Sequence, residues 1–150
     1  SVVSINIVDT AKIWMKSCNG YDITHVDRKD SLCSITIKKE DLLVICDAPD
    51  NVISQENVHV KGPPYIKFYA GCPVHNNGFR IGTLCLINLE NRQFSEKDRQ
   101  TLLLLGAVVD NEIKLTNYCD EILCKNDKLE EDIKFKNKMM IVGQVEKHFK

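Results

Sequence analysis

A predicted β-hairpin near the middle of the chain constrains the fold more than any other feature. Residues 66–75 alternate with the period of a strand, and Asn76-Asn77-Gly78 then supplies residues that accept the positive φ angles of a tight turn. Residues 80–88 return as a second strand that is apolar on both faces. We therefore expect this return strand to be central in a sheet that is covered on both sides. One face of the first strand is expected to carry Ile66, Phe68, Ala70, Cys72 and Val74.

Further strands are predicted on the N-terminal side of this hairpin. Residues 2–8 and 12–17 show the alternation of half-buried strands and are expected to pair with each other. Residues 42–46 form a short apolar run that suits a buried strand. Residues 30–39 are ambiguous, because their apolar side chains alternate as in a strand while the Asp and Ser at their start would cap a helix. The residues alone leave both structures open.

A long helix is predicted to begin at Ser95, whose hydroxyl can cap the free amide groups of a first turn. Apolar residues then recur at spacings of three and four, and this stripe is expected to pack on the sheet. The stripe consists of Leu102, Leu105, Val109 and Ile113.

A heptad pattern follows and predicts a coiled coil. Leu115, Ile122 and Leu129 occupy d positions, and Cys119, Asn126, Ile133 and Met140 occupy a positions. Lys136 continues the same spacing, and Cys119 and Lys136 weaken the seam. A single Asn at an a position favours a parallel, in-register pair of helices, so the expected partner is a second copy of this chain. The alternative is one long helix that folds back on its own domain. We thus expect a domain over residues 1–115 and a helical extension over residues 116–150.

The composition argues against several kinds of partner. The 150 residues carry a formal net charge of -1, so there is no broad basic surface for nucleic acid. The longest apolar run, residues 102–109, is far shorter than the roughly 20 residues that span a bilayer, and no membrane contact by this segment is expected. The seven cysteines are odd in number and include no C-x-x-C pair, which favours reduced thiols in a cytoplasmic protein and no metal site.

The order of several motifs resembles the GAF family of sensory domains over roughly residues 4–115. The motifs are Ile13-Trp14-Met15-Lys16-Ser17, Ser31-Leu32-Cys33, the segment from Val44 to Asp50, and Pro64-x-Ile66-x-Phe68-Tyr69-Ala70-Gly71-x-Pro73 followed by Gly78 and Ile81-Gly82-Thr83-Leu84-Cys85. The resemblance implies an α+β fold, with a five- or six-stranded antiparallel sheet flanked by helices as in GAF and PAS domains. It also implies a helix over residues 30–39. One face of the sheet would pack on the terminal helices, and the other would form a small-molecule pocket.

The chain departs from the family pattern in three respects. Ile35 stands where many relatives carry a histidine, which removes a polar group from the expected pocket. Asn88 stands where an aspartate is common. The helix that usually precedes the first strand is absent, which favours a piece of a longer protein whose output domain lies outside this sequence.

Seven residues are candidates for ligand binding: Trp14, Cys33, Asp47, Phe68, Tyr69, Gly71 and Cys85. Tyr69 offers a ring and a hydroxyl beside Lys67 to a planar or anionic ligand, or else it seals a loop. The resemblance places the two thiols near the pocket, where they either sense oxidants or pack as small apolar groups. Asp47 either binds the ligand or stabilises a turn. Gly71 allows close approach either of a ligand or of neighbouring protein atoms.

These observations predict a regulatory module without catalytic activity. A small ligand of unknown identity, with any cofactor also unknown, would bind in the pocket and shift the pairing of the C-terminal helix. Two alternatives stay open: a free methionine sulfoxide reductase of GAF-like fold, and a dimerisation scaffold without a ligand. No histidine is paired in sequence with a nucleophile and an acid as in a catalytic triad.

Overall fold

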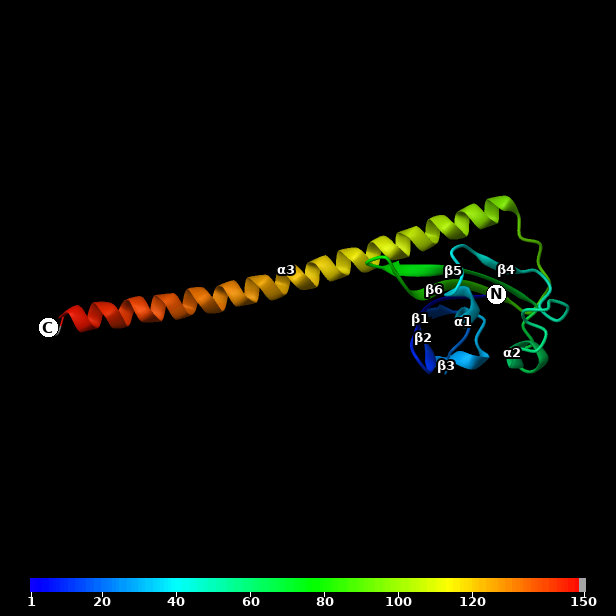
Figure 1. Cartoon of the computed structure of the whole chain (residues 1–150), viewed down its shortest axis with the longest axis horizontal. Coiled ribbons are helices and arrows are strands. Elements are labelled where there is room, and N and C mark those ends of the chain that lie inside the picture. The colour runs from blue at the N-terminus through cyan, green and yellow to red at the C-terminus, as the bar shows by residue number, and fades with distance from the viewer. Residues whose placement is uncertain (149–150) are drawn as a thin grey trace. The chain divides into compact units, whose positions relative to one another are not determined.

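The computed structural model describes residues 1–148. The first part of the chain folds around one sheet (Figure 1). The sheet has six strands in the order β3-β2-β1-β6-β5-β4, and every neighbouring pair is antiparallel. The strands are β1 (Val2–Val8), β2 (Lys12–Asn19), β3 (His25–Asp27), β4 (Leu43–Ile45), β5 (Phe68–Asn76) and β6 (Phe79–Asn88). The predicted α+β fold, with a five- or six-stranded antiparallel sheet and a long C-terminal helix, is confirmed, and the sheet has six strands.

Helical segments cover the sheet. They are η1 (Arg28–Asp30), α1 (Cys33–Thr36), α2 (Val58–Lys61) and α3 (Glu96–His148). The helix that the resemblance implied over residues 30–39 is confirmed in type, but α1 has only four residues. Beyond Thr36 the amides of Lys38 and Lys39 bond to carbonyls three residues back, so the helix ends in tight turns.

The central hairpin forms as the turn residues predict. Asn77 and Gly78 join β5 to β6 with φ angles of 49° and 81°, and two consecutive positive φ angles match a turn that suits the twist of paired strands. β6 also pairs with β1. The two backbones run so close at Gly82 that a Cβ there would overlap the carbonyl oxygen of Asn6. The predicted central position of the return strand is confirmed.

One face of the sheet packs against the beginning of α3 (Figure 1). Its buried side chains are Phe68, Ala70, Cys72, Val74 and Leu84. The sulfur of Cys72 lies 3.6 Å from the carbonyl oxygen of Leu102, and a Cβ on Gly106 would come within 2.7 Å of that sulfur. The predicted stripe is wrong at Leu105, which is 52% exposed, because the helix turns the bare Gly106 toward the sheet instead.

The opposite face of the sheet carries the main apolar cluster. It contains Ile13, Leu32, Cys33, Leu43, Ile45, Ala48, Val60, Ile66, Tyr69 and Cys85. Ile66 was predicted to share a face with Phe68, and this is wrong. β5 begins only at Phe68, and Tyr65 has a φ angle of 63°, so the alternation of the strand does not extend back to Ile66.

The chain divides into two compact units, residues 1–111 and the part of α3 from residue 112 onward. α3 begins with a capping box in which Ser95 Oγ accepts a hydrogen bond from the Asp98 amide and the Asp98 carboxylate accepts from the Ser95 amide and hydroxyl. In the second unit the apolar side chains of the predicted heptad seam are exposed: Leu115, Ile122, Leu129, Ile133 and Met140.

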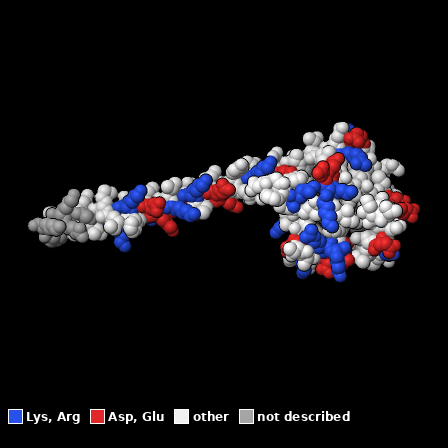
Figure 2. Space-filling view, in the orientation of Figure 1, with Lys and Arg blue, Asp and Glu red and all other residues white. Residues whose placement is uncertain are grey.

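The surface mixes both signs of charge, as a net charge near zero requires. Figure 2 shows Lys and Arg side chains near Asp and Glu side chains on the visible face of the sheet domain and again along α3. Within residues 1–148, no helix combines the length and the apolarity that crossing a membrane needs.

Candidate functional site

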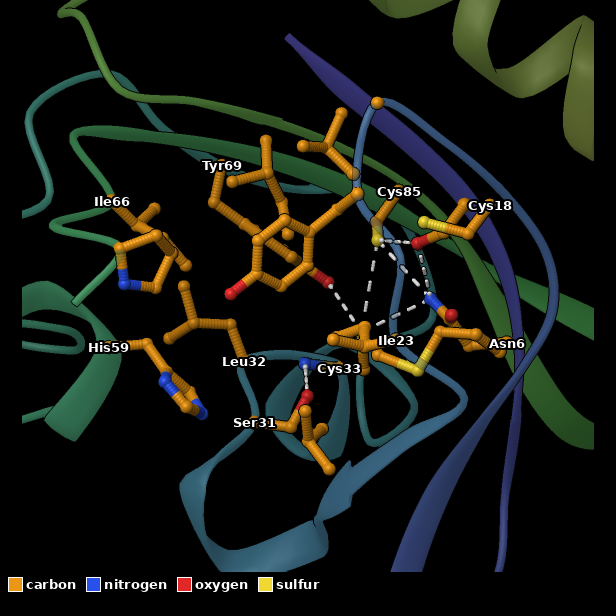
Figure 3. A pocket seen from close by; sticks show the side chains of 18 of the residues that line it. Asn6, Cys18, Ile23, Ser31, Leu32, Cys33, His59, Ile66, Tyr69 and Cys85 are labelled. Atoms are coloured by element: carbon orange, nitrogen blue, oxygen red, sulfur yellow. Dashed lines mark hydrogen bonds between the residues drawn. The ribbon is translucent and has the colours of Figure 1, made fainter.

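A cavity of about 330 Å³ lies between the sheet and the segments that carry η1, α1 and α2 (Figure 3). Its volume is near the lower end of the roughly 300–1,000 Å³ that small-molecule sites occupy. The apolar side chains that line it include Val2, Met15, Ile23, Val26, Leu32, Pro63, Pro64, Ile66, Ile87 and Leu89. The cavity therefore suits a compact and largely apolar molecule.

A row of small polar and sulfur side chains forms the sheet side of this pocket. Ser4 on β1 is paired with Cys18 on β2 and with Cys85 on β6, so the three side chains share a face. Ser4 Oγ lies 3.2 Å from Cys85 Sγ. Asn6 donates from Nδ2 to Ser4 Oγ at 3.0 Å and to Cys85 Sγ at 3.3 Å. Figure 3 shows Asn6, Cys18 and Cys85 on one side of the cavity.

The side-chain oxygen of Asn6, Oδ1, differs from the other polar atoms of this network because it lacks a hydrogen bond within the described part of the chain. Asn6 is fully buried and lines the pocket, yet its Oδ1 has no hydrogen-bond partner among the described residues. A buried acceptor without a donor costs roughly 1–3 kcal/mol.

Tyr69 closes one side of the pocket, and its position depends on Gly71. A Cβ on Gly71 would come within 2.5 Å of the Tyr69 hydroxyl, so the glycine makes room for this side chain. The hydroxyl lies 2.7 Å from Thr36 Oγ1 and donates to Cys33 Sγ at 3.6 Å. Burial, and then the negative charge of a Cys33 thiolate, raise the pKa of Tyr69, so the hydroxyl remains a donor.

The thiols of Cys33 and Cys85 form a close pair in the pocket wall. Their sulfur atoms lie 3.9 Å apart, and the two residues are 4% and 1% exposed. Hydrogen bonding with the Cys85 thiol lowers the pKa of Cys33, although burial opposes the shift. The same interaction raises the pKa of Cys85. The hydrogen bond between the two thiols thus favours ionisation of Cys33 over ionisation of Cys85.

The charges on the pocket wall disfavour an anionic ligand. Among the lining side chains of residues 1–148 are Asp30 and His59, but neither Lys nor Arg. Lys67, which was predicted to assist Tyr69 with an anionic ligand, does not line the cavity. An uncharged ligand fits this wall better than a phosphate or a carboxylate.

The structure brings together three of the seven predicted site residues. Cys33, Tyr69 and Cys85 meet at the pocket, and Gly71 lies under the ring of Tyr69. The space beside Gly71 is thus filled by a side chain of the same strand and not by a ligand.

The other three predicted residues lie outside the pocket. Phe68 lies on the opposite face of the sheet, with its ring 5.5 Å from that of Phe94, because neighbours in a strand point to opposite faces and Tyr69 faces the cavity. Trp14 is 39% exposed on β2, and its ring lies 5.0 Å from that of His25. Asp47 follows β4 and accepts a hydrogen bond from the side-chain amide of Asn91.

Ser4, Asn6 and Cys18 were missed by the sequence analysis. The alternation in residues 2–8 is typical of a strand whose apolar face is buried, but Ser4 and Asn6 are 4% and 0% exposed while Val3 is 40% exposed. The signal that would have found them is the strand register, which pairs Ser4 with Cys85 and Cys18 and pairs Asn6 with Thr83, and the sequence does not contain it.

A family model for the GAF domain matches residues 6–113, and this chain belongs to the GAF family. The chain is also similar to a cyclic di-GMP phosphodiesterase of Pseudomonas aeruginosa, with 32% identity over 139 residues. That match covers 88% of this chain but 24% of the enzyme, so the chain spans about a quarter of the relative's length.

Solved structures share the fold. One is a free methionine-R-sulfoxide reductase from Neisseria meningitidis in complex with its substrate, with a TM-score of 0.65, 18% identity, and coverage of 79% of this chain and 70% of that one. Another is the GAF domain of an Acinetobacter phosphoenolpyruvate-protein phosphotransferase, with a TM-score of 0.62, 17% identity, and coverage of 80% and 74%. At these identities the likeness shows the fold alone.

The prediction that this chain is not an enzyme is contradicted by these comparisons. The relative that matches most of the chain is a phosphodiesterase, and free methionine-R-sulfoxide reductases have the same fold. Membership of this family therefore does not exclude catalysis.

The pKa of Cys33 is expected to depend on the donor at position 85. Cys85→Ala removes the hydrogen-bond partner, whereas Cys85→Ser keeps a donor of similar size, so the pKa of Cys33 should rise more in the alanine variant. The pH dependence of iodoacetamide modification at Cys33, followed by peptide mass spectrometry, measures this pKa. Equal values in wild type and both variants would contradict the thiol pair as the cause.

Proposed function

We propose that this chain is a sensory module whose pocket binds a compact, uncharged, mostly apolar molecule that carries a hydrogen-bond donor. Asn6 Oδ1 carries the proposal, because it is a buried acceptor that no described residue satisfies and it belongs to a side chain that lines a cavity of about 330 Å³. A ligand N–H or O–H group would pair with this oxygen, while the surrounding side chains would bury apolar surface.

Similarity to the phosphodiesterase supports one class of output. The shared segment is 24% of that enzyme, so most of the relative lies outside the match. On our proposal, the pocket regulates cyclic di-GMP hydrolysis by a domain beyond this sequence. A ligand would need to bind one arrangement of the module more tightly than the other by about 1–3 kcal/mol, the usual size of coupling between sites.

α3 is the proposed route for the signal. Its exposed apolar residues follow a heptad pattern, with Leu129 at a d position and one Asn, Asn126, at an a position. This pattern supports a parallel pairing of α3 with the α3 of a second copy of the chain. An Asn at one a position fixes the register of such a pair, at some cost in stability. The seven free thiols support a location in the reducing cytoplasm.

Indole and 1-methylindole form a matched pair of probes for the pocket. Both are compact and uncharged, but only indole has an N–H donor. Wild type is expected to bind indole about tenfold more tightly, since a hydrogen bond to an otherwise unpaired buried oxygen is worth roughly 1–3 kcal/mol. Isothermal titration calorimetry measures both affinities.

Two variants locate this preference in the pocket. Asn6→Leu removes the acceptor and is expected to abolish the preference for indole. Asn91→Leu alters an exposed amide that does not line the cavity and is expected to keep it. Equal affinities of wild type for the two probes, or a preference that survives Asn6→Leu, would refute the assigned ligand chemistry.

Two lysine substitutions of similarly exposed apolar residues test the helix pairing. Leu129→Lys places a charge in the seam, whereas Phe135→Lys places one at a c position, away from the seam. By analytical ultracentrifugation the wild type and the Phe135 variant are expected to be dimers and the Leu129 variant a monomer. A monomeric wild type at micromolar concentration would rule out the proposed pairing.

Reduction of a small sulfoxide is a second candidate function, favoured by the 3.9 Å between the sulfur atoms of Cys33 and Cys85. Two thiols can release the oxygen of a sulfoxide as water while they become a disulfide. It is ranked second because the described pocket wall offers no Lys or Arg to a substrate carboxylate. Incubation with free methionine-R-sulfoxide and dithiothreitol would release methionine beyond the protein-free control, and no release would exclude this activity.

A further inference from the structure

Two thiols that are far apart in the sequence meet on the pocket wall. Cys33 begins α1, Cys85 lies in the middle of β6, and their sulfur atoms are 3.9 Å apart. A disulfide has sulfur atoms about 2.05 Å apart, so the two sulfur atoms need to approach by roughly 1.9 Å. We propose that Cys33 and Cys85 form a reversible disulfide and that the pocket is a site of oxidation by a small hydroperoxide.

The sheet register excludes the third thiol of the pocket from this bond. Cys18 and Cys85 are both paired with Ser4, one on each side, so two strand spacings separate them. This places their backbones about 9.5 Å apart, beyond the 4.4–6.8 Å between the Cα atoms of most disulfides.

Cys72 is a matched control inside the same fold. It is as buried as Cys33, at 2% exposed, but it lies on the opposite face of the sheet beside Gly106. Burial raises the pKa of Cys72 to about 11, so it remains a thiol near neutral pH. Cys33 thus has the Cys85 thiol beside it and is favoured as a thiolate, whereas Cys72, which is also buried, has neither property.

The reaction balances with a hydroperoxide as the oxidant. The Cys33 sulfur, favoured as thiolate by its hydrogen bonds, attacks the terminal oxygen of ROOH, the O–O bond breaks, and ROH leaves with a proton from the solvent or the thiol pair. Cys33 is then a sulfenic acid. The Cys85 sulfur displaces its oxygen, which leaves as water, and the two-electron oxidation of both thiols is complete.

The disulfide would join α1 to the central strand and change the wall that a ligand meets. Asn6 Nδ2 contacts both sulfur atoms, at 3.6 Å from Cys33 and 3.3 Å from Cys85. Oxidation of the two thiols therefore changes the contacts of Asn6, the residue that carries the proposed function. This effect on ligand binding rests on the proposed function. Oxidised protein is expected to bind indole less tightly than reduced protein.

The test uses the full chain with Cys119→Ser and Cys124→Ser, which remove exposed thiols on α3. The reduced protein is treated with hydrogen peroxide, the peroxide is removed with catalase, and free thiols are alkylated in denaturant before digestion and mass spectrometry. We expect one linked peptide pair that joins Cys33 to Cys85 and that dithiothreitol separates, while Cys72 is recovered alkylated.

A further variant tests the order of the steps. With Cys85→Ser the sulfenic acid on Cys33 has no resolving thiol, so dimedone should label Cys33 in this variant and not in the parent protein. Recovery of both Cys33 and Cys85 as alkylated thiols in the oxidised parent would overturn the proposal, as would a link from Cys18 to Cys85. The peptide map needs no ligand, so a failure of indole binding leaves its result unaffected.

Discussion

The pairing of β6 with β1 on one side and β5 on the other is the interaction on which the rest of this structure depends. It places Cys85 opposite Ser4 and opposite Gly71 in one row across the sheet. The close backbone approach at Gly82 leaves no room for a side chain between β6 and β1. Since side chains alternate along every strand, this register decides which residues meet the pocket and which meet α3. A slip by one residue would exchange the two faces.

The chemistry of the pocket follows from small side chains held in that register. Because Gly71 has no Cβ, Tyr69 can lie across its own strand and reach Thr36 with its hydroxyl. Ser4 leaves the thiol of Cys85 accessible to Asn6. Larger residues at these positions would fill the space with carbon, whereas the observed ones produce a polar network with an unpaired acceptor. A cavity with few, fixed polar groups is typical of sites that recognise small molecules.

Membership of the GAF family explains the architecture, whereas the chemistry of the site depends on the residues that line the pocket. The same fold is found in reductases and in a phosphotransferase GAF domain at low sequence identity, so the fold by itself does not select a function. The relative with 32% identity is much longer than this chain. α3 exposes apolar side chains at heptad spacing, including Leu115, Ile122 and Leu129.

The sequence by itself determined the elements whose signals are local: the hairpin at Asn77-Gly78, the capped start of α3, and, through family motifs, the arrangement of the sheet. Only the tertiary structure decided which faces are buried. Ser4 and Asn6 look exposed by alternation, yet the register with β6 turns them inward. The pairing of Cys33 with Cys85 spans 52 residues. Periodicity reports on neighbours along the chain, whereas burial and contact between distant side chains depend on which elements pack together, and no local pattern contains that information.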